Sequence, residues 1–222
     1  MAALIELIDD PDIFMRQLND IGLPGLHVWK ESAKRCGYTG TQVHVEESQQ
    51  HHHSTLAEIW TMIDRLSVSE QVKRDAKAVY MIIAEAESFV HGQPVEMVHF
   101  HEVGAPDAIA DIVGTCLLME NLRVDQVVLS PIHVGSGTVK CAHGVMTVPT
   151  PATAKILEGM PIYSRDVQGE LCTPTGAALL RYFGQRFGPM PEMHVYKSGR
   201  GIGTKGFPGQ VNGLAVMLGE TE

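Results

Sequence analysis

The chain has 222 residues, of which 44% are hydrophobic and 19% charged, and its formal net charge is −9. These values are typical of a globular protein with a substantial core, in one large domain or two small ones. With a pI near 5.6 and no run of Lys or Arg, we expect neither nucleic acid nor a membrane surface as a partner. No stretch reaches the roughly 18 consecutive apolar residues that a membrane span requires.

The cysteines and the N-terminus bear on the cellular compartment. The four cysteines lie far apart and include no C-x-x-C pair: Cys36, Cys116, Cys141 and Cys172. The opening MAALIELIDD has no basic segment and becomes acidic at once, unlike a signal peptide. We therefore expect reduced thiols and a cytoplasmic protein.

Residues 1–92 are predicted to be rich in helix, with one β-hairpin. Thr55 with Glu58, and Ser67 with Glu70, match the capping box that begins a helix. Alternating apolar residues separated by a glycine-rich turn predict the hairpin. The predicted helices are Ala2–Ile8, Asp12–Ile21 (closed by Gly22), Thr55–Leu66 and Val68–His91 (closed by Gly92), and the hairpin strands are Leu26–Ser32 and Gln42–Glu46.

A polar connection, EESQQHHH, ends in the three consecutive histidines His51, His52 and His53. Consecutive side chains cannot all face one way, so at most two of them are expected to converge on one metal ion. A solvated loop and a metal-capturing loop remain alternatives for this segment.

The stretch VHFHEVGAPDAIADIVG, residues 98–114, concentrates the groups that carry chemistry. Glu96–His101 alternates like a short strand, which places His99 and His101 on the same face. Glu102 follows in a turn, and Pro106 fits the first turn of a helix.

The helix that follows is predicted to present two carboxylates beside these imidazoles. Asp107 and Asp111 are four residues apart and share a face near the positive end of the helix dipole. Ligands usually bind at the carboxyl ends of strands in open α/β sheets. The corner therefore predicts a metal or catalytic site of His99, His101, Glu102, Asp107 and Asp111, although acids in a first helical turn also simply complement the dipole.

The next segment is predicted to complete a strand–helix–strand unit. Gln126–Ser130 is an apolar run typical of a buried strand, so that 96–130 would contribute two parallel strands joined by a right-handed crossover. In the loop Pro131–Gly137, Gly135 and Gly137 allow close backbone approach to a ligand.

Two further helix starts lie beyond that loop. Cys141 and His143 precede Gly144, and Thr150 caps a helix that begins at Pro151 and ends at Gly159. A Thr-Pro-Thr-Gly turn then opens another helix, where Thr173, Thr175 and Gly176 form a candidate anion site for a phosphate or carboxylate. Ordinary N-capping by threonine is the alternative.

The C-terminal region contains GRGIGTKG, whose glycines superficially match a dinucleotide fingerprint. The run does not lie between a strand and a helix, because residues 212–218 alternate like a strand. We therefore reject a Rossmann interpretation.

Three long motifs, together with the HHH–STLAEI junction, resemble the N-terminal part of the LarC family of nickel insertion proteins. They are HFHEVGAPDAIADIVG, CAHGVMTVPTPATAKIL and GELCTPTGAALL, in this order. The resemblance implies a CTP-dependent nickel chelatase, a lyase that inserts Ni(II) into pyridinium-3,5-bisthiocarboxylic acid mononucleotide. It also implies that this chain starts just after the family's first strand and lacks its C-terminal domain, where CTP and a divalent metal would bind.

On this resemblance, several residues acquire expected roles. Ni(II) accepts imidazole and carboxylate ligands. Formation of a nickel–carbon bond removes the C4 proton of the pyridinium ring, and His101 and His143 are both candidates for the base. Thr173–Gly176 would hold the phosphate of the mononucleotide.

We expect an α/β fold with a central parallel or mixed sheet flanked by helices. Within one module of 222 residues, its parts are helix-rich 1–92, a βαβ core at 96–183 and C-terminal strands at 193–218. The expected function is nickel delivery by the N-terminal module, in a homo-oligomer and with a separate C-terminal domain or chain as a possible partner. The alternatives are a non-catalytic nickel-binding module that uses His51–His53, and an inactive or assembly fragment.

Overall fold

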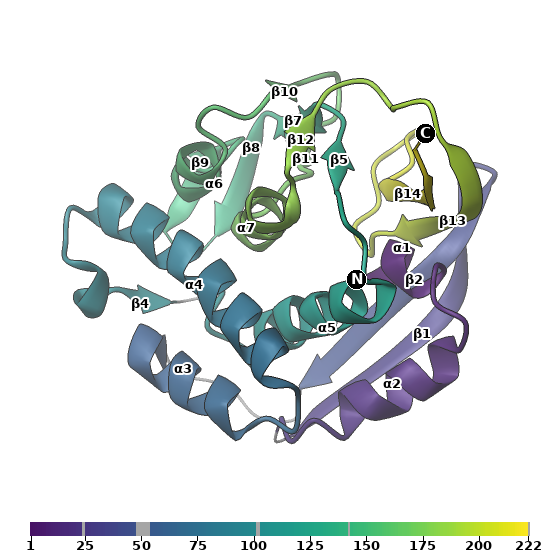
Figure 1. The fold of residues 1–222 in the computed structure, drawn as a ribbon. Helices are drawn as coiled ribbons and strands as arrows, with labels where there is room; N and C mark the ends of the chain where they lie inside the picture. The colour runs from purple at the N-terminus through teal and green to yellow at the C-terminus, as the bar shows by residue number, and fades with distance from the viewer. Residues whose placement is uncertain (24, 48–53, 101–102, 142, 222) are drawn as a thin grey trace.

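The computed structural model describes residues 1–23, 25–47, 54–100, 103–141 and 143–221. The helices pack against a sheet on one side of the molecule and against a set of short strands on the other (Figure 1). The helices are α1 (Ala2–Ile5), α2 (Pro11–Asn19), α3 (Leu56–Arg65), α4 (Glu70–His91), α5 (Pro106–Leu122), α6 (Pro151–Ile156), α7 (Pro174–Phe183) and the short 3₁₀ helix η1 (Val95–Met97).

Helix α5 lies at the centre of the molecule (Figure 1). Every residue from Ile112 to Leu118 is buried. Because consecutive residues point to all sides of a helix, this part of α5 is buried all round and not only along one stripe. Helix α5 contacts α4, strand β2, α1 and α7. The core is therefore built around this helix.

The predicted hairpin is confirmed and belongs to a four-stranded sheet. Strand β1 (Leu26–Arg35) pairs in antiparallel register with β2 (Tyr38–Glu47). The C-terminal strands β13 (His194–Ile202) and β14 (Gly213–Glu220) form a second antiparallel pair. The sheet order is β1-β2-β13-β14, and β13 joins β2 in parallel through Gly201 and Thr41.

The glycines of GRGIGTKG support the rejection of a Rossmann interpretation. Gly199 and Gly201 lie within β13, beneath α1. A Cβ on Gly199 would overlap the carbonyl oxygen of Ala3, and one on Gly201 would lie 2.7 Å from the amide nitrogen of Ala3. These glycines let a helix pack directly on a strand.

Short paired strands between α5 and β13 complete the fold. Parallel pairs join β5 (Val128–Leu129) to β12 (Arg186–Phe187) and β6 (Ile132–His133) to β10 (Ile162–Tyr163). Antiparallel pairs join β7 (Gly135–Ser136) to β11 (Gly169–Glu170) and β8 (Thr138–Cys141) to β9 (Gly144–Thr147). Parallel and antiparallel pairs together with the helices confirm the predicted α/β class with mixed pairing.

One expectation about strand pairing is wrong. The strand before α5 is β4 (His99–Phe100), which pairs antiparallel with β3 (Ser54–Thr55), whereas β5 pairs with β12. The predicted parallel partners of the 96–130 unit therefore belong to different sheets. The reason is α5: its stretch Ile112–Leu118 is buried on all sides, so the helix does not lie on one face of a sheet as a crossover helix does.

The helix ends follow the predicted capping signals with one shift. Thr55 and Glu58 form the predicted capping box of α3. Helix α4 is capped by Ser69, whose side chain accepts a hydrogen bond from the amide of Val72, rather than by Ser67. Gly92 closes α4 in the left-handed conformation, as predicted.

Candidate functional site

The corner between β4 and α5 places His99 on an accessible surface. His99 is exposed, whereas Val98 and Phe100 on either side of it are buried. This alternation is the one predicted for the strand. His101 and Glu102, the next members of the predicted metal site, lie outside the described residues.

Helix α4 anchors this corner. The hydroxyl of Tyr80 donates a hydrogen bond of 3.1 Å to the carbonyl oxygen of Val103, and its ring lies edge-on to Phe100 at 6.1 Å between centroids. Gly104 is needed for the tight turn, because a Cβ there would lie 2.9 Å from the Cβ of Phe100. Phe100 and Val103 are thus both held against a buried tyrosine.

The first turns of α5 carry Asp107 and Asp111 on the accessible side of the helix. Burial raises the pKa of Tyr80 well above its usual value, and the negative charges of these two carboxylates act in the same direction. Asp111 keeps an exposed surface, but protein atoms crowd its carboxyl, and this desolvation is the main cause of its raised pKa. The positive charge of the Met1 ammonium opposes this rise in the pKa, and the negative charge of Asp107 adds to it. Both carboxylates therefore lie near the hydroxyl of Tyr80 and close to each other.

Glu58 brings a further carboxylate to His99, which sequence reasoning considered only as a helix cap. Its pKa is lowered, chiefly by hydrogen bonds from the amide and hydroxyl of Thr55 and to a smaller degree by His99. Thr55 pairs directly with His99 between β3 and β4. That antiparallel pair, absent from the predicted topology, explains why the glutamate was missed.

No group of three or more His, Cys, Asp or Glu side chains is arranged to hold a metal ion among the residues that the structure describes. His99, Asp107 and Asp111 therefore do not form a metal site by themselves. The other predicted ligands of the corner are His101 and Glu102. The rival ligands His51, His52 and His53 also lie outside the described residues.

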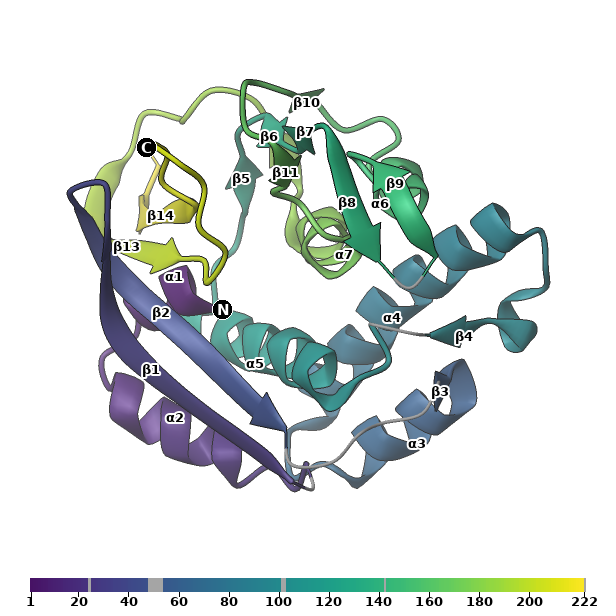
Figure 2. The ribbon, with the colours of Figure 1, turned by 180° about the vertical axis from the view of Figure 1, so that it is seen from behind.

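His143 lies beside a histidine that sequence reasoning did not single out. It occupies the turn between β8 and β9, and its ring centroid is 5.0 Å from that of His91 at the end of α4. Figure 2 shows this hairpin extending toward α4. Oε2 of Glu87, one turn earlier in α4, is 3.4 Å from Nε2 of His91. The four-residue spacing of Glu87 and His91 on a helix is the signal that was available in the sequence.

Gly135 and Gly137 pack against the protein's own chain. A Cβ on Gly135 would overlap the carbonyl oxygen of Gly169, and one on Gly137 would overlap the side chain of Gln168. The close backbone approach that these glycines permit is therefore made to β11 and the residue before it. Their predicted contact with a substrate stays a prediction.

The predicted anion turn at the start of α7 forms a capped helix terminus. Oγ1 of Thr173 accepts a hydrogen bond of 3.3 Å from the amide of Gly176. Thr175 and Gly176 are half-buried. The hydroxyl of Thr173 thus caps the helix, and the positive end of the helix dipole remains at this turn.

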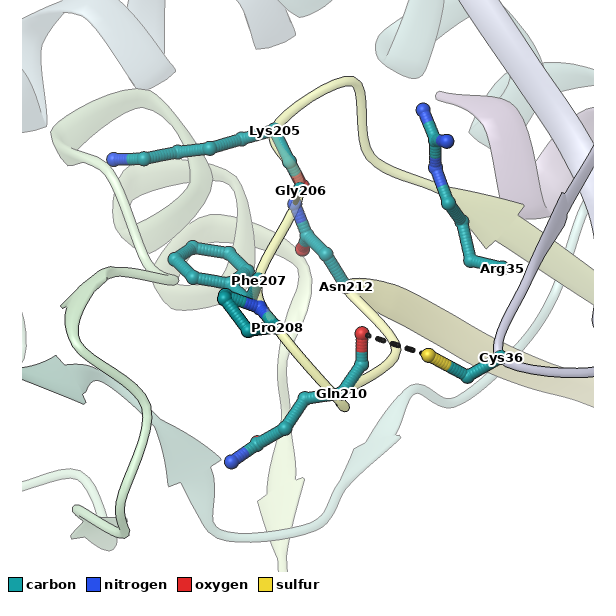
Figure 3. Close-up of a pocket in the computed structure, with 8 residues that line it drawn as sticks. All are labelled: Arg35, Cys36, Lys205, Gly206, Phe207, Pro208, Gln210 and Asn212. Atoms are coloured by element: carbon teal, nitrogen blue, oxygen red, sulfur yellow. Dashed lines mark hydrogen bonds between the residues drawn. The ribbon is translucent and has the colours of Figure 1, made fainter.

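A pocket of about 310 Å³ lies between the tip of β1–β2 and the loop before β14, and a Cβ on Gly169, which packs on Gly135, would lie 2.9 Å from the ring of its lining residue Phe207. It is lined by Arg35, Cys36, Lys205, Gly206, Phe207, Pro208, Gln210 and Asn212. Figure 3 shows the side chain of Lys205 extending away from Arg35, so the two cations do not converge on one anion. The Cys36 thiol donates a hydrogen bond of 3.6 Å to the carbonyl oxygen of Gln210. This contact links the two loops.

The described helices include none that is both long and apolar enough to cross a membrane.

Comparison with known proteins identifies the family. The family model "Nickel insertion protein" matches residues 1–222. A pyridinium-3,5-bisthiocarboxylic acid mononucleotide nickel insertion protein of Desulfitobacterium hafniense is 41% identical over 92% of this chain and 51% of its own length. A putative nickel insertion protein of Rhodopirellula baltica is 40% identical over 99% of this chain and 56% of its own length.

A third relative, from Staphylococcus saprophyticus, is 36% identical over 100% of this chain and 57% of its own length and carries the same name as the Desulfitobacterium protein. The chain thus spans about half the length of the curated relatives it matches. No solved structure matches it. The family match covers the whole sequence and includes all three motifs that suggested the resemblance, and the chain belongs to the nickel insertion protein family.

Proposed function

We propose that this chain is the nickel-holding module of a nickel insertion protein and delivers Ni(II) to pyridinium-3,5-bisthiocarboxylic acid mononucleotide. The names of its relatives support this substrate. The observation that carries the proposal within the chain is the β4–α5 corner, where the exposed His99 lies near the carboxylate of Glu58 and the helix that follows begins with the exposed Asp107 and Asp111.

The donor types at this corner suit an ion that must be bound and then released. Ni(II) accepts imidazole and carboxylate ligands. His99 and Asp107 are exposed, and Asp111 keeps an exposed surface although its carboxyl is crowded. Their mixed oxygen and nitrogen donors would hold the ion less firmly than a closed set of four thiolates. His101 and Glu102 are the remaining proposed ligands.

The start of α7 is the proposed position of the substrate's phosphate. Thr173, Thr175 and Gly176 surround a helix N-terminus, where backbone amides and the helix dipole favour an anion. Gly135 and Gly137 complete the proposed substrate-binding set. Binding of CTP, which the family resemblance implies, stays a prediction.

The reaction also requires a base. A nickel–carbon bond at C4 of the pyridinium ring forms as the C4–H bond breaks, with the electron pair of that bond passing to nickel and the proton to the base. His101 and His143 are the two candidates. Their single substitutions by glutamine separate them: the variant that lacks the base would still bind nickel and the mononucleotide but would form no product.

Equilibrium dialysis of Ni(II) against the full chain tests the proposal. We expect the triple variant His99→Ala, Asp107→Asn, Asp111→Asn to lose one equivalent of bound nickel. His44→Ala is the matched control, because His44 is also paired with a glutamate, Glu31, but lies on the distant β1–β2 hairpin.

Two results would contradict the proposal. Loss of that equivalent only when His51, His52 and His53 are replaced would assign nickel to the rival, non-catalytic binding segment. The absence of any saturable nickel site in the unmodified chain would favour an inactive or assembly fragment.

A further inference from the structure

The pair His91–His143 lies outside the corner assigned above, and its geometry suits a metal ion. The two histidines are 52 positions apart in the sequence, yet their ring centroids are 5.0 Å apart with planes inclined by 38°. One residue ends α4 and the other lies at the turn of the β8–β9 hairpin. A long helix and a hairpin thus bring two imidazoles to one place.

The separation matches what shared coordination requires. Imidazole nitrogens bind a transition ion at about 2.0–2.1 Å, which places each ring centroid roughly 3.2 Å from the ion. Two such rings have centroids about 4.5 Å apart at a right angle between ligands and about 5.2 Å apart at the tetrahedral angle. The observed 5.0 Å lies between these limits.

The electrostatic surroundings of the pair favour a cation. Oε2 of Glu87 is 3.4 Å from Nε2 of His91, which brings a carboxylate next to the two imidazoles. His91 is also the last residue of a 22-residue helix. The negative end of a helix dipole lies at its C-terminus and stabilises positive charge there.

Packing holds the two elements in this arrangement. Helix α6, which follows the hairpin, contacts α4 along its length. Nζ of Lys155 in α6 lies 4.1 Å from the ring centroid of Phe89, two residues before His91. Both imidazoles remain accessible, so an ion can reach them from solvent.

We propose that the two imidazoles of His91 and His143 form a second Ni(II) site that is open to solvent and distinct from the β4–α5 corner, with Glu87 orienting His91 and not itself a ligand. Water completes the coordination shell, as suits an ion in transit. His91 lies about three helical turns, or roughly 16 Å, along α4 from Tyr80, which contacts the corner. The inference rests on the proposed nickel function, and it assigns His143 to metal binding rather than to removal of the proton.

Isothermal titration of the full chain with Ni(II) tests this site, with circular dichroism to verify the fold of each variant. The unmodified chain is expected to bind two equivalents of nickel. His91→Ala and His143→Ala are each expected to weaken one equivalent by at least about ten-fold, and the double variant to lose that equivalent altogether. Glu87→Gln is expected to weaken it by about 10-fold, as is typical when a carboxylate beside a metal-binding histidine is removed.

Substitution of His91 distinguishes the two possible roles of His143. Metal binding by His143 would require His91 as its partner, whereas removal of a proton by His143 would not. X-ray absorption of the nickel-loaded chain supplies a readout other than affinity: the imidazole contribution should decrease in His91→Ala and remain in the control His44→Ala. Unchanged nickel affinity and absorption in His91→Ala would overturn the inference while leaving the corner site intact. Failure of the unmodified chain to bind nickel at all would instead overturn the proposed function, and with it this site.

Discussion

Buried side chains account for the packing around α4 and α5, whereas the region from Val128 to Phe187 combines buried side chains with close contacts of the backbone. Around α5 the largest fully buried side chains meet, among them Tyr80, Phe100, Ile109 and Ile112. In the other region six of the strands have only two residues, and the chain packs on itself at glycines such as Gly135. The two regions therefore respond to different kinds of substitution.

This difference bears on where function can lie. The candidate nickel ligands His99, Asp107 and Asp111 are attached to the side-chain core, which fixes their backbone. The proposed substrate turn, Thr173–Gly176, belongs to the region of short strands, where fewer ladder hydrogen bonds resist movement. In such a site the rigid region would hold the ion, and the more mobile region of short strands would admit the substrate.

The largest predicted effect is in the glycine-dependent region. Gly135 has φ +91°, and an added Cβ would overlap the carbonyl oxygen of Gly169. We expect Gly135→Ala to lower the free energy of unfolding by more than about 4 kcal/mol, as measured by urea denaturation.

Gly159→Ala is the matched control for that change. Gly159 also has a positive φ, +81°, but nothing lies within 4 Å of its added Cβ. Only the backbone penalty remains, about 1–2 kcal/mol. Equal losses in the two variants would show that contact with Gly169 does not hold this region together.

In the side-chain core we expect a smaller loss. Ile112 is fully buried in α5. Ile112→Ala should cost about 3 kcal/mol, through lost transfer free energy and the cavity that remains. Ile13→Ala, at a position that is 53% exposed, should change stability by less than about 0.5 kcal/mol in the same urea titration. A loss at Ile112 no larger than that at Ile13 would contradict the central role of α5.

The sequence allowed much of the side-chain core to be predicted. The period of apolar residues located α4 and α5, the capping box located the start of α3, and alternation located the β1–β2 hairpin. These signals are local, since each depends on neighbours within one or two turns of chain. Pairing is not local: β4 joins β3 because α3 and α4 fold back on each other, which no short pattern records.

The residues of the candidate site also fall into two groups, those that a local pattern predicts and those that only long-range pairing brings into place. The alternation that separates His99 from Val98 and Phe100 was predicted and is observed, whereas Glu58 and His91 were missed because β3–β4 pairing and the hairpin bring them into place. At Gly135 the pattern correctly indicated a close backbone approach, but sequence alone could not tell a ligand from the protein's own chain.

The contact between β4 and the start of α3 predicts a smaller loss of stability in the region around α4 and α5. Thr55 accepts a hydrogen bond from the amide of Glu58 at 3.3 Å and pairs with His99. Thr55→Ala should cost about 1 kcal/mol, the usual value of an N-cap. Thr61→Ala, an exposed position within the same helix, should be neutral or slightly stabilising because alanine has the higher helix propensity. Equal changes in thermal stability would show that the cap does not secure this corner.

The smallest expected effect is a pH dependence in the region of short strands. Burial lowers the pKa of His133 below its usual 6.5, and the positive charge of Arg165 adds to this. In its neutral form Nε2 accepts a hydrogen bond of 3.0 Å from the amide of Arg165, and the ring stacks on Tyr163 with centroids 4.7 Å apart.

Because the unfolded chain binds the His133 proton more tightly, stability falls as the pH drops from the unfolded pKa of 6.5 toward the lower folded value. His133→Gln removes this titration while every other histidine remains. The difference between unfolding free energies at pH 7.5 and pH 5 should therefore be smaller in the variant than in the unmodified chain. If the difference were the same in the variant and in the unmodified chain, protonation of His133 would not weaken the pairing of β6 with β10. The region of short strands would then keep this pairing in acid.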